Sequence, residues 1–358
     1  MTNRPVEITL TGSPKEMGAQ HGSLLREQIG NLAEIRCELL GRLYGLAALE
    51  TAKLVAESMC SVMAKRTPEA LAETTATARS AEIPFWKLLV AGAFSDISDV
   101  VSRTFRIKPN PHLECTLLPL RTSKGVVILG TWDSHASAVD SLILCRRQPA
   151  SGPETLALST AGWPMQQGVT SAGVGFAIAN LVATTVSSGV SYIAALPHVC
   201  SGKSLAAVCK RLARVPHASA RYYLICSEST QRSLEIIPGR QPGVTVDDLQ
   251  CHTNHFTDAV TEQYEGRTST IRTSRERQVL GVAFSEQSPW HASAEQRIHD
   301  FAQSAMIQRG QGDDDRTGAI FLITPASGDL HFVVPAPAGE DDTPEVVHRN
   351  ISICREGE

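Results

Sequence analysis

The fold of this chain is decided by one segment, His112-Leu-Glu-Cys115-Thr-Leu-Leu-Pro-Leu-Arg-Thr-Ser-Lys-Gly-Val-Val-Ile-Leu-Gly130-Thr-Trp-Asp133. The apolar runs on either side of the polar cluster Thr122-Ser-Lys-Gly125 predict two β-strands joined by a hairpin turn, the first of them opened by Cys115. A hairpin of this length returns the end of its second strand to the start of its first. We therefore expect the carboxylate of Asp133 to lie near the thiol of Cys115.

The first part of the chain has the pattern of a helical segment. After a short run typical of a strand, residues 6–10, apolar residues recur every three or four positions, which is the period of amphipathic helices. This pattern predicts helices over residues 24–40, 47–63 and 68–81. The dipeptide Ile83-Pro84 interrupts the pattern, because proline favours an extended conformation in the residue before it.

From Cys115 onward the pattern changes to short β-rich runs separated by Gly, Pro and Ser. These runs predict strands over residues 142–145, 155–159, 174–178, 222–226, 234–237, 243–246, 319–323 and 330–334. Further helices are predicted over residues 204–214, 270–282 and 292–307. Helices, strands, helices and strands in this order favour a layered α+β fold.

Composition limits the class of partner. The 358 residues suffice for one elaborated domain or two ordinary ones; 42% are hydrophobic, 20% are charged, and the formal net charge is −4. Without a basic excess to neutralise phosphates, we expect neither nucleic acid nor a membrane as the main partner. No apolar run approaches the roughly 18 residues of a membrane span, and the N-terminus lacks the apolar core of a signal peptide. We therefore expect a cytoplasmic protein.

The cysteines, histidines and glycines indicate no cofactor site. Nine cysteines, an odd number without a Cys-x-x-Cys pair, suit a reducing compartment, and most are interpreted as inert buried side chains. His252 and His255 have a spacing that metal ligands can have, but no further ligands are evident nearby, so we expect no metal. Gly173-x-Gly175 lacks the strand-turn-helix context of a dinucleotide site and is interpreted as a tight hairpin.

Cys115 and Asp133 carry a resemblance to a known family. A Cys-Thr or Cys-Ser pair that opens a strand, followed by Asp in a Gly-x-Asn-x-Asp signature, is typical of the acyl-CoA:6-aminopenicillanate acyltransferase family of cysteine N-terminal-nucleophile hydrolases. Here Asp133 lies eighteen residues after Cys115, as in that pattern. Thr131 stands where the family usually has Asn, and Glu114 stands where it commonly has Gly.

A second motif extends the resemblance over most of the chain. The segment His252-Thr-Asn-His-Phe256 is similar to the family's His-Thr-Asn-His-Phe motif, and the Gly-rich hairpin over residues 162–175 is also similar. The resemblance implies a four-layer αββα sandwich of the N-terminal-nucleophile type. It further implies that residues 1–114 form a mainly helical pro-region and residues 115–358 form the catalytic core.

The resemblance implies a reaction centred on Cys115. Self-cleavage between Glu114 and Cys115 would free the α-amine of Cys115, and this amine would serve as the base that activates the thiol for attack on an acyl carbonyl. A model α-amine titrates near pH 7.7–8.0 and a model thiol near 8.5, so a proton is shared between them almost evenly. Asp133 would hold and tune the amine.

The same resemblance implies an oxyanion hole. Asn254 would supply its side-chain NH₂ to the tetrahedral intermediate, and losing such a donor typically costs about a hundred- to a thousand-fold in rate. His252, Thr253 and His255 would support the loop that carries Asn254. Arg272, in Ser-Thr-Ile-Arg272, is similar to a family Ser-x-x-Arg; it either orients this constellation or is a solvated arginine on a helix.

Two hypotheses follow. The first is an autoprocessing amidohydrolase or acyltransferase that acts on a small N-acyl amide or acyl-thioester and whose two fragments stay together as a heterodimer, alone or in a higher oligomer. The second is a non-catalytic binding protein of the same fold, in which Cys115 is a core cysteine and Asp133 caps a turn. Thr131 and Glu114 keep the second hypothesis open.

Overall fold

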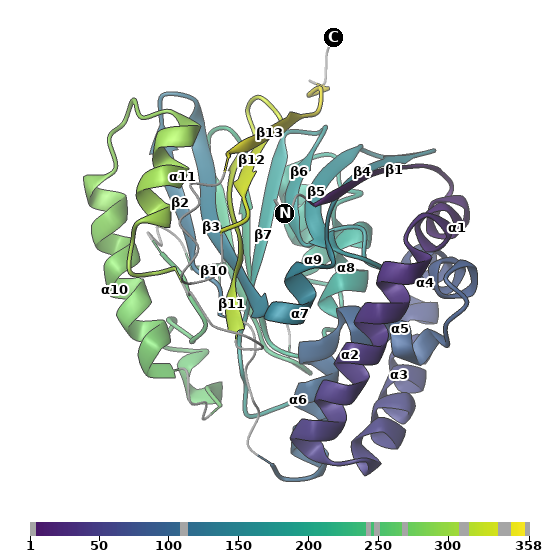
Figure 1. The fold of residues 1–358 in the computed structure, drawn as a ribbon. Helices are drawn as coiled ribbons and strands as arrows, with labels where there is room; N and C mark the ends of the chain where they lie inside the picture. Colours follow the sequence, from purple (N-terminus) through teal and green to yellow (C-terminus); the bar gives the residue numbers. More distant parts are fainter. Residues whose placement is uncertain are drawn as a thin grey trace.

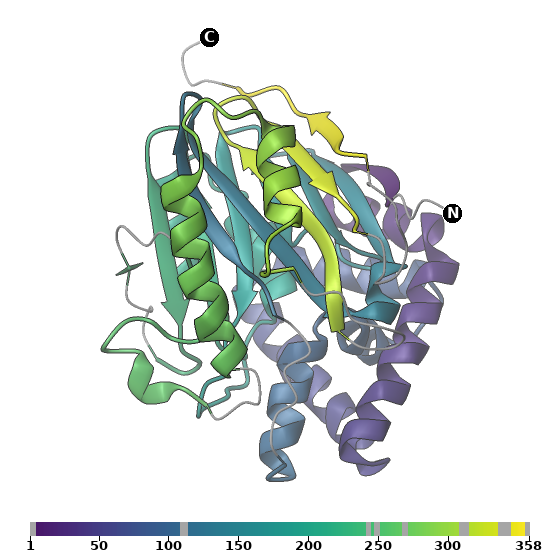
Figure 2. The same ribbon diagram turned by 60° about the vertical axis from the view of Figure 1, so that its left-hand side comes forward.

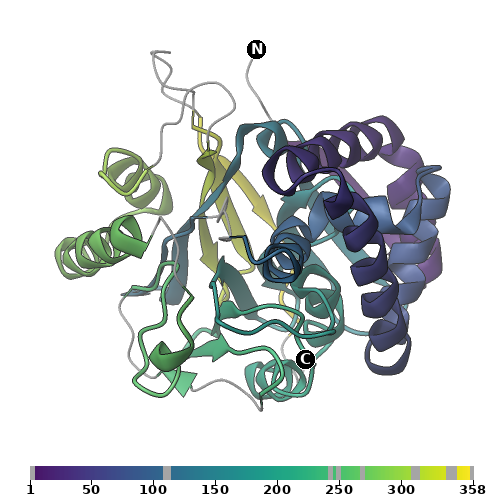
Figure 3. The same cartoon turned by 90° about the horizontal axis from the view of Figure 1, so that it is seen from below.

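The protein is built from two β-sheets that lie face to face, with helices on the outer face of each (Figure 1). The computed structural model describes residues 5–107, 114–240, 245–246, 251–266, 271–307, 315–335 and 345–354. Viewed along the layers, two C-terminal helices, the smaller sheet, the larger sheet and the N-terminal helices follow one another (Figure 3). The expected four-layer αββα sandwich is confirmed.

The larger sheet joins the first strand of the chain to strands of the C-terminal part. Its order is β1-β4-β5-β6-β7-β8-β9-β10. The strands are β1 (Val6–Gly12), β4 (Leu142–Pro149), β5 (Thr155–Thr160), β6 (Gln167–Thr170), β7 (Val174–Asn180), β8 (Arg221–Cys226), β9 (Gln231–Ile236) and β10 (Thr245–Val246). β1 and β4 run parallel, and the other neighbours run antiparallel.

The smaller sheet contains the predicted hairpin. Its order is β13-β12-β11-β3-β2. The strands are β2 (Leu117–Thr122), β3 (Gly125–His135), β11 (Asp315–Thr324), β12 (Asp329–Val333) and β13 (Val347–Asn350). The hairpin is confirmed, but β2 begins at Leu117 and not at Cys115, whose N–H bonds to the side chain of Asn254 instead of a neighbouring strand.

Helices cover both outer faces. On the larger sheet lie α1 (Pro14–Leu24), α2 (Arg26–Tyr44), α3 (Ala47–Arg66), α4 (Pro68–Ser80), α5 (Phe85–Gly92), α6 (Phe94–Thr104), α8 (Tyr192–Val199) and α9 (Leu205–Leu212). On the smaller sheet lie α10 (Ile271–Gln287) and α11 (Ala294–Ala302) (Figure 2). The short α7 (Ala136–Val139) follows β3. Among the described helices, none combines the length and apolar composition needed to cross a bilayer.

Three apolar cores hold the four layers together. One lies between the N-terminal helices and the larger sheet, a second between the two sheets, and a third between the smaller sheet and α11. Ile29, Ile128 and Phe301 are each fully buried in one of these cores, in that order. Burial of apolar surface at roughly 25 cal/mol per Å² is the main force that stacks such layers.

Most of the predicted elements are confirmed, but α1, α8 and β13 are among the elements that were not predicted. The helix predicted over 24–40 is α2, and the separate helix α1 ends just before it, at Leu24. Helix α6 was not predicted, although its buried Phe94, Ile97 and Val101 have helical spacing; the rest of its buried face consists of Ser and Asp residues. Residues 243–244 and 270, at the starts of two predicted elements, lie outside the described residues.

Helices α1 and α4 pack unusually close because two glycines face α4. A Cβ on Gly18 would lie 2.1 Å from the carbonyl oxygen of Glu73, and a Cβ on Gly22 would lie 2.3 Å from that of Thr77. Four residues apart, the two glycines share one helix face. Between them, the buried ring of His21 accepts a hydrogen bond from the Gly162 N–H at 3.0 Å. Burial lowers the pKa of His21 to about 3, so the ring is neutral.

This packing predicts opposite effects of alanine at two helical glycines. Gly22→Ala is expected to destabilise the protein by about 1–3 kcal/mol, because the new methyl group collides with backbone that cannot move freely. Gly30→Ala in α2 is the matched control: its Cβ would meet nothing within 4 Å, so better helix propensity should stabilise by about 0.5–1 kcal/mol. Urea unfolding of both variants measures the difference, and effects of the same sign would contradict the packing described.

Candidate active site

The structure brings the thiol of Cys115 and the carboxyl group of Asp133 together at the open end of the β2–β3 hairpin, opposite its turn. Cys115 lies two residues before the start of β2, and β3 passes beside it, with the Thr131 N–H donating to the Thr116 carbonyl at 2.9 Å. Cys115 is 4% exposed and Asp133 is fully buried. A thiol and a carboxyl group thus share one buried position between the two sheets.

Burial controls the chemistry of the thiol. Burial and, to a smaller extent, the charge of Asp133 raise the pKa of Cys115 to about 12. The backbone N–H of Asp133 and the guanidinium groups of Arg277 and Arg221 oppose this rise, because each stabilises the thiolate. In the uncleaved chain the thiol is therefore protonated at neutral pH.

Asp133 is perturbed in the same direction. Burial raises the pKa of its carboxyl group to about 7, against the opposing effects of Arg277 and of the Thr317 and Thr131 hydroxyls. Its Oδ2 accepts from the Thr131 hydroxyl at 3.2 Å, and that hydroxyl accepts from the Thr116 N–H at 3.0 Å. Oδ1 is buried and has no hydrogen-bond partner among the described residues. Thr131, where the family usually has Asn, thus links the carboxylate to the backbone beside Cys115.

Asn254 binds the backbone of the nucleophile directly. Its Oδ1 accepts the N–H of Cys115 at 2.9 Å, and its Nδ2 donates to the carbonyl of Asn180, the last residue of β7, at 3.0 Å. Its own N–H donates to the Ser274 hydroxyl at 2.8 Å. The side-chain amide is therefore oriented from both ends, with its oxygen toward Cys115.

His252 anchors the segment that carries Asn254. The His252 N–H and carbonyl pair with those of Leu117, each bond being 2.9 Å, so this segment extends the sheet beside β2. The ring lies 2.8 Å from both the Glu235 carboxylate and the Thr253 carbonyl, and it stacks on Tyr222 with ring centres 3.6 Å apart. Both polar partners are acceptors, and together they hold the ring in one orientation.

Thr253 and His255 meet at the hydroxyl of Ser274. The Thr253 hydroxyl lies 2.9 Å from it and the His255 Nδ1 lies 2.8 Å from it. Burial, followed by the charge of His252, lowers the pKa of His255 to about 4, which keeps the ring neutral. The three predicted support residues therefore lie around the Asn254 loop, tying it to α10 and to β9.

Arg272 does not belong to this cluster, which corrects its assignment as an orienting residue. Its side chain is 85% exposed and pairs with Glu276 at 3.4 Å. Arg277 lies about one and a half turns further along α10, and its side chain is the one that points toward the cluster. Its Nη1 donates to the carbonyl of Cys115 and to the Thr116 hydroxyl, both at 2.9 Å.

The other terminal nitrogen of Arg277 binds two more groups of the site. Nη2 donates to Asn254 Oδ1 at 3.0 Å and to the carboxylate of Glu114 at 3.2 Å. The Thr273 hydroxyl lies 3.5 Å from the same carboxylate. One guanidinium group therefore holds the residue before the expected cleavage point, the residue after it and the proposed oxyanion donor.

Helix rotation explains why Arg277 is the inward arginine. At about 100° per residue, positions five apart face directions about 140° apart, so only one of Arg272 and Arg277 can face the sheet. The buried residues of α10 are Ser274, Arg277 and Gly281, at spacings of three and four. This stripe of small residues around one arginine was the available signal, but it contains no apolar side chain to mark the face as buried.

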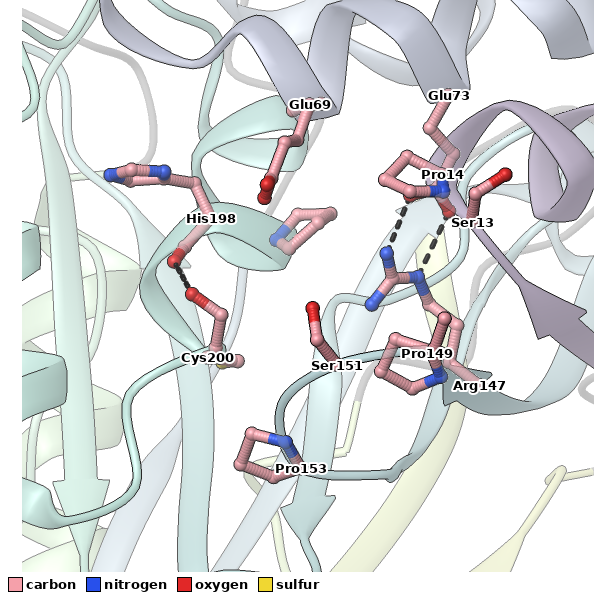
Figure 4. Close-up of a pocket in the computed structure, with 14 residues that line it drawn as sticks. Ser13, Pro14, Glu69, Glu73, Arg147, Pro149, Ser151, Pro153, His198 and Cys200 are labelled. Atoms are coloured by element: carbon pink, nitrogen blue, oxygen red, sulfur yellow. Dashed lines mark hydrogen bonds and ion pairs between the residues drawn. The ribbon is translucent and has the colours of Figure 1, made fainter.

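A cavity of about 180 Å³ lies away from this cluster (Figure 4). It is lined by α1, α4, α8 and the turn between β4 and β5, and at its edge Arg147 Nε donates to the Glu73 carboxylate at 2.9 Å. None of its lining residues touches Cys115. Among the described residues no group of three or more His, Cys, Asp or Glu is arranged to hold a metal ion.

The two arginines of α10 give a direct test of this geometry. Arg277→Ala is expected to destabilise the protein by about 3–5 kcal/mol, because it removes a buried cation that donates to the Cys115 carbonyl, the Thr116 hydroxyl and the Glu114 carboxylate. Arg272→Ala, the control on the same helix, is expected to change stability by less than about 0.5 kcal/mol. Equal midpoints of urea unfolding for the two variants would contradict the placement of Arg277.

The chain is similar to known proteins in its sequence and in its fold. The sequence model of the family described as acyl-coenzyme A:6-aminopenicillanic acid acyl-transferase matches residues 120–337, more than half of the chain. A mutant of the conjugated bile acid hydrolase from Clostridium perfringens has a TM-score of 0.41 and 12% identity, covering 66% of this chain and 92% of that one. Comparison with curated proteins gives no match.

Two further solved structures are similar at the same level. Penicillin V acylase from Agrobacterium tumefaciens has a TM-score of 0.41 and 14% identity, covering 68% of this chain and 80% of that one. The Caenorhabditis elegans ortholog of N-acylethanolamine-hydrolyzing acid amidase has a TM-score of 0.42 and 7% identity, covering 59% of this chain and 93% of that one. The family match shows that the chain belongs to the acyl-coenzyme A:6-aminopenicillanic acid acyl-transferase family and is an enzyme, as the sequence predicted.

Proposed function

We propose that this protein is an autoprocessing cysteine hydrolase or acyltransferase that acts on a small N-acylated molecule through an acyl-enzyme on Cys115. One observation carries the proposal. Asn254 accepts a hydrogen bond from the backbone N–H of Cys115, Arg277 donates one to its carbonyl, and Asp133 lies beside its thiol. These contacts fix a single residue from three separate elements. A core cysteine with only a packing role needs none of them.

Maturation begins at the peptide bond between Glu114 and Cys115. The thiol attacks the Glu114 carbonyl, the C–N bond breaks, and the thiol proton passes to the released nitrogen of Cys115. Water then hydrolyses the resulting thioester and leaves Glu114 with a new carboxylate. The hydrogen bond from the Cys115 N–H to Asn254 at 2.9 Å orients the leaving nitrogen for this step.

The released amine changes the electrostatics of the site. An α-ammonium next to Cys115 is a new positive charge, which favours the thiolate and lowers the thiol pKa from its high value in the uncleaved chain. The buried Oδ1 of Asp133, which has no hydrogen-bond partner among the described residues, is the acceptor that suits this amine. The thiol proton passes to the neutral form of this amine, and the ammonium so formed stays beside the thiolate that attacks the acyl carbonyl.

Asn254 is proposed to stabilise the oxyanion of the tetrahedral intermediate. Its amide is held by the Asn180 carbonyl and by Arg277, so the donor needs no reorganisation when charge develops. The acyl group then passes from Cys115 to water or to an amine. Amides and thioesters of small acids are the substrate class that this chemistry serves.

The two fragments are proposed to remain associated after cleavage. Strand β1 of the N-terminal segment pairs in parallel with β4 over seven residues, from Val6 to Gly12. The helices of the same segment share a continuous apolar core with the larger sheet. Separating the fragments would expose this whole interface to water.

Intact-mass analysis tests the proposal most directly. The purified protein is expected to give two fragments divided before Cys115 that elute together, whereas Cys115→Ala should remain one folded, inactive chain. Cys115→Ser should be cleaved and should turn over more slowly, because a hydroxyl is far less acidic than a thiol.

Activity is measured on p-nitroanilides and thioesters with straight-chain acyl groups of increasing length. Cys145→Ala is a matched control, since Cys145 is a fully buried free thiol on β4 outside the cluster. A wild-type chain that stays whole and shows no thiol-dependent turnover would support the binding-protein hypothesis instead.

The ionisation of the buried Asp133 carboxyl group is expected to lower the stability of the protein although its activity requires this residue. Its folded-state pKa is about 7 and an unfolded Asp titrates near 3.9, so the folded protein binds the extra proton between these values. The stability it contributes is therefore complete below about pH 4 and is lost as pH rises through about 7. Asn at position 133 cannot ionise, so adding Asp133→Asn to the uncleaved Cys115→Ala chain should raise its stability at pH 8 by up to about 4 kcal/mol, whereas Asp133→Asn alone should be inactive. Urea unfolding of the two uncleaved chains at pH 5 and pH 8 checks this; a double variant less stable than Cys115→Ala at pH 8 would contradict it.

A further inference from the structure

A buried polar cluster joins helix α6 to the strands behind Asn254. At its centre lies Arg221, the first residue of β8, whose side chain is 2% exposed. Its guanidinium carbon lies 4.5 Å from the centre of the Tyr192 ring. A guanidinium buried this deeply must be neutralised and hydrogen-bonded on several sides. The reaction described above does not use this cluster.

The N-terminal segment supplies the anion. Arg221 Nη2 donates to Asp96 Oδ1 and to the Ser95 hydroxyl, both at 2.6 Å, and Ser95 and Asp96 are consecutive residues at the start of α6. Asp96 Oδ1 also accepts from the Ser219 hydroxyl, and its Oδ2 accepts from the Tyr192 N–H at 3.1 Å. A carboxylate bound on both oxygens cannot swing away, so it fixes the guanidinium in one orientation.

The other side of the same guanidinium faces the proposed active site. Arg221 Nη1 donates to Asn180 Oδ1 and, at 2.6 Å, to the Ala220 carbonyl. The Asn180 carbonyl accepts from Asn254 Nδ2, and Asn254 Oδ1 accepts from the Cys115 N–H. An unbroken series of hydrogen bonds therefore leads from a carboxylate on α6 to the backbone of the nucleophile.

The positive charge of Arg221 also acts on the thiol of Cys115. Arg221, on β8, is one of two guanidinium groups that favour the thiolate of Cys115; the other is Arg277 on α10. The acidic group that faces the thiol is Asp133 on β3, and Glu114 precedes it in the chain. Asp96 partly neutralises Arg221, so it sets how much positive charge from β8 reaches the thiol.

We propose that Asp96 is a positioning residue of the active site, which acts through Arg221 to fix Asn180 and, through it, Asn254. The N-terminal segment would then contribute to turnover after cleavage, beyond its role as a pro-region. This inference rests on the proposed function, and its test separates the two.

The decisive variant is Asp96→Asn, which keeps the size of the side chain and an acceptor oxygen but removes the charge. Its kcat on the best p-nitroanilide or thioester of the panel is expected to fall about 10- to 100-fold, because small displacements of catalytic groups cost this much, while KM stays within about twofold. The rate of precursor cleavage, followed by intact mass, should fall with it.

Glu73→Gln is the matched control. Glu73 is also a buried carboxylate of the N-terminal segment, and it pairs with Arg147 on β4 through two hydrogen bonds of 2.9 and 2.5 Å. Both side chains are less than 9% exposed, as in the Asp96 pair, but neither touches the Cys115 cluster. This variant should lose stability and keep the kcat of the wild type.

The pH profile distinguishes positioning from a merely structural role. In Asp96→Asn the charge of Arg221 loses its directly bonded carboxylate, while Asp99 on the same helix still acts on it, so the thiolate is favoured and the acidic limb of kcat/KM should move to lower pH. In Glu73→Gln the limb should stay in place. Equal loss of stability in the two variants with a shift in only one supports the inference.

A second pair of variants covers the case in which Asp96→Asn does not fold. Ser95→Ala removes one acceptor of Arg221, and Ser98→Ala, its control on the same helix, removes a buried hydroxyl that bonds to Tyr44 at 2.7 Å. Ser95→Ala should lower kcat about 3- to 10-fold, and Ser98→Ala should not lower it.

The outcomes divide cleanly. A wild type that is cleaved and active, with Asp96→Asn or Ser95→Ala at wild-type kcat, would overturn this inference and leave the proposed function intact. A wild type that is neither cleaved nor active would overturn both. A reduced kcat in both Asp96→Asn and Glu73→Gln, with no shift of the acidic limb, would assign Asp96 to stability alone.

Discussion

The buried guanidinium of Arg277 is the interaction on which the rest of the site depends. A charge removed from water must find several oxygen acceptors at once, and Arg277 finds them on Cys115, Thr116, Asn254 and Glu114. These acceptors belong to the start of the hairpin, to the segment beside it and to the residue before the expected cleavage point. The hydrogen bonds of this one guanidinium group therefore hold four acceptor groups next to one another.

The geometry around Cys115 favours reactivity over stability. A thiol and a carboxyl group are buried side by side, and burial raises the pKa of both, so either charge is costly in the uncleaved chain. The cost is tolerated because the surrounding sheets and cores are extensive. A released α-amine beside Asp133 would supply the missing positive charge. In the intact chain the buried thiol is therefore protonated and a poor nucleophile, and the proposed self-cleavage would activate it.

The N-terminal segment is integrated into the protein at three levels. Strand β1 extends the larger sheet, the helices complete one of the three apolar cores, and α6 places Asp96 against Arg221. The close approach of α1 and α4 at Gly18 and Gly22 makes the helical layer compact enough to cover the sheet. A segment bound in these ways is an integral part of the fold.

The sequence by itself determined the hairpin, the approach of Asp133 to Cys115, and the layered arrangement of helices and sheets. These features could be predicted because they depend on patterns over short distances along the chain. Apolar residues recur at every second position in strands and at every third or fourth position in helices, and turn residues separate the elements. Only the tertiary structure decided that Arg277 and not Arg272 faces inward, and that Ser95 and Asp96 are buried. A polar helix face looks the same in sequence whether water or a distant arginine satisfies it, and Arg221 lies more than one hundred residues away from Asp96.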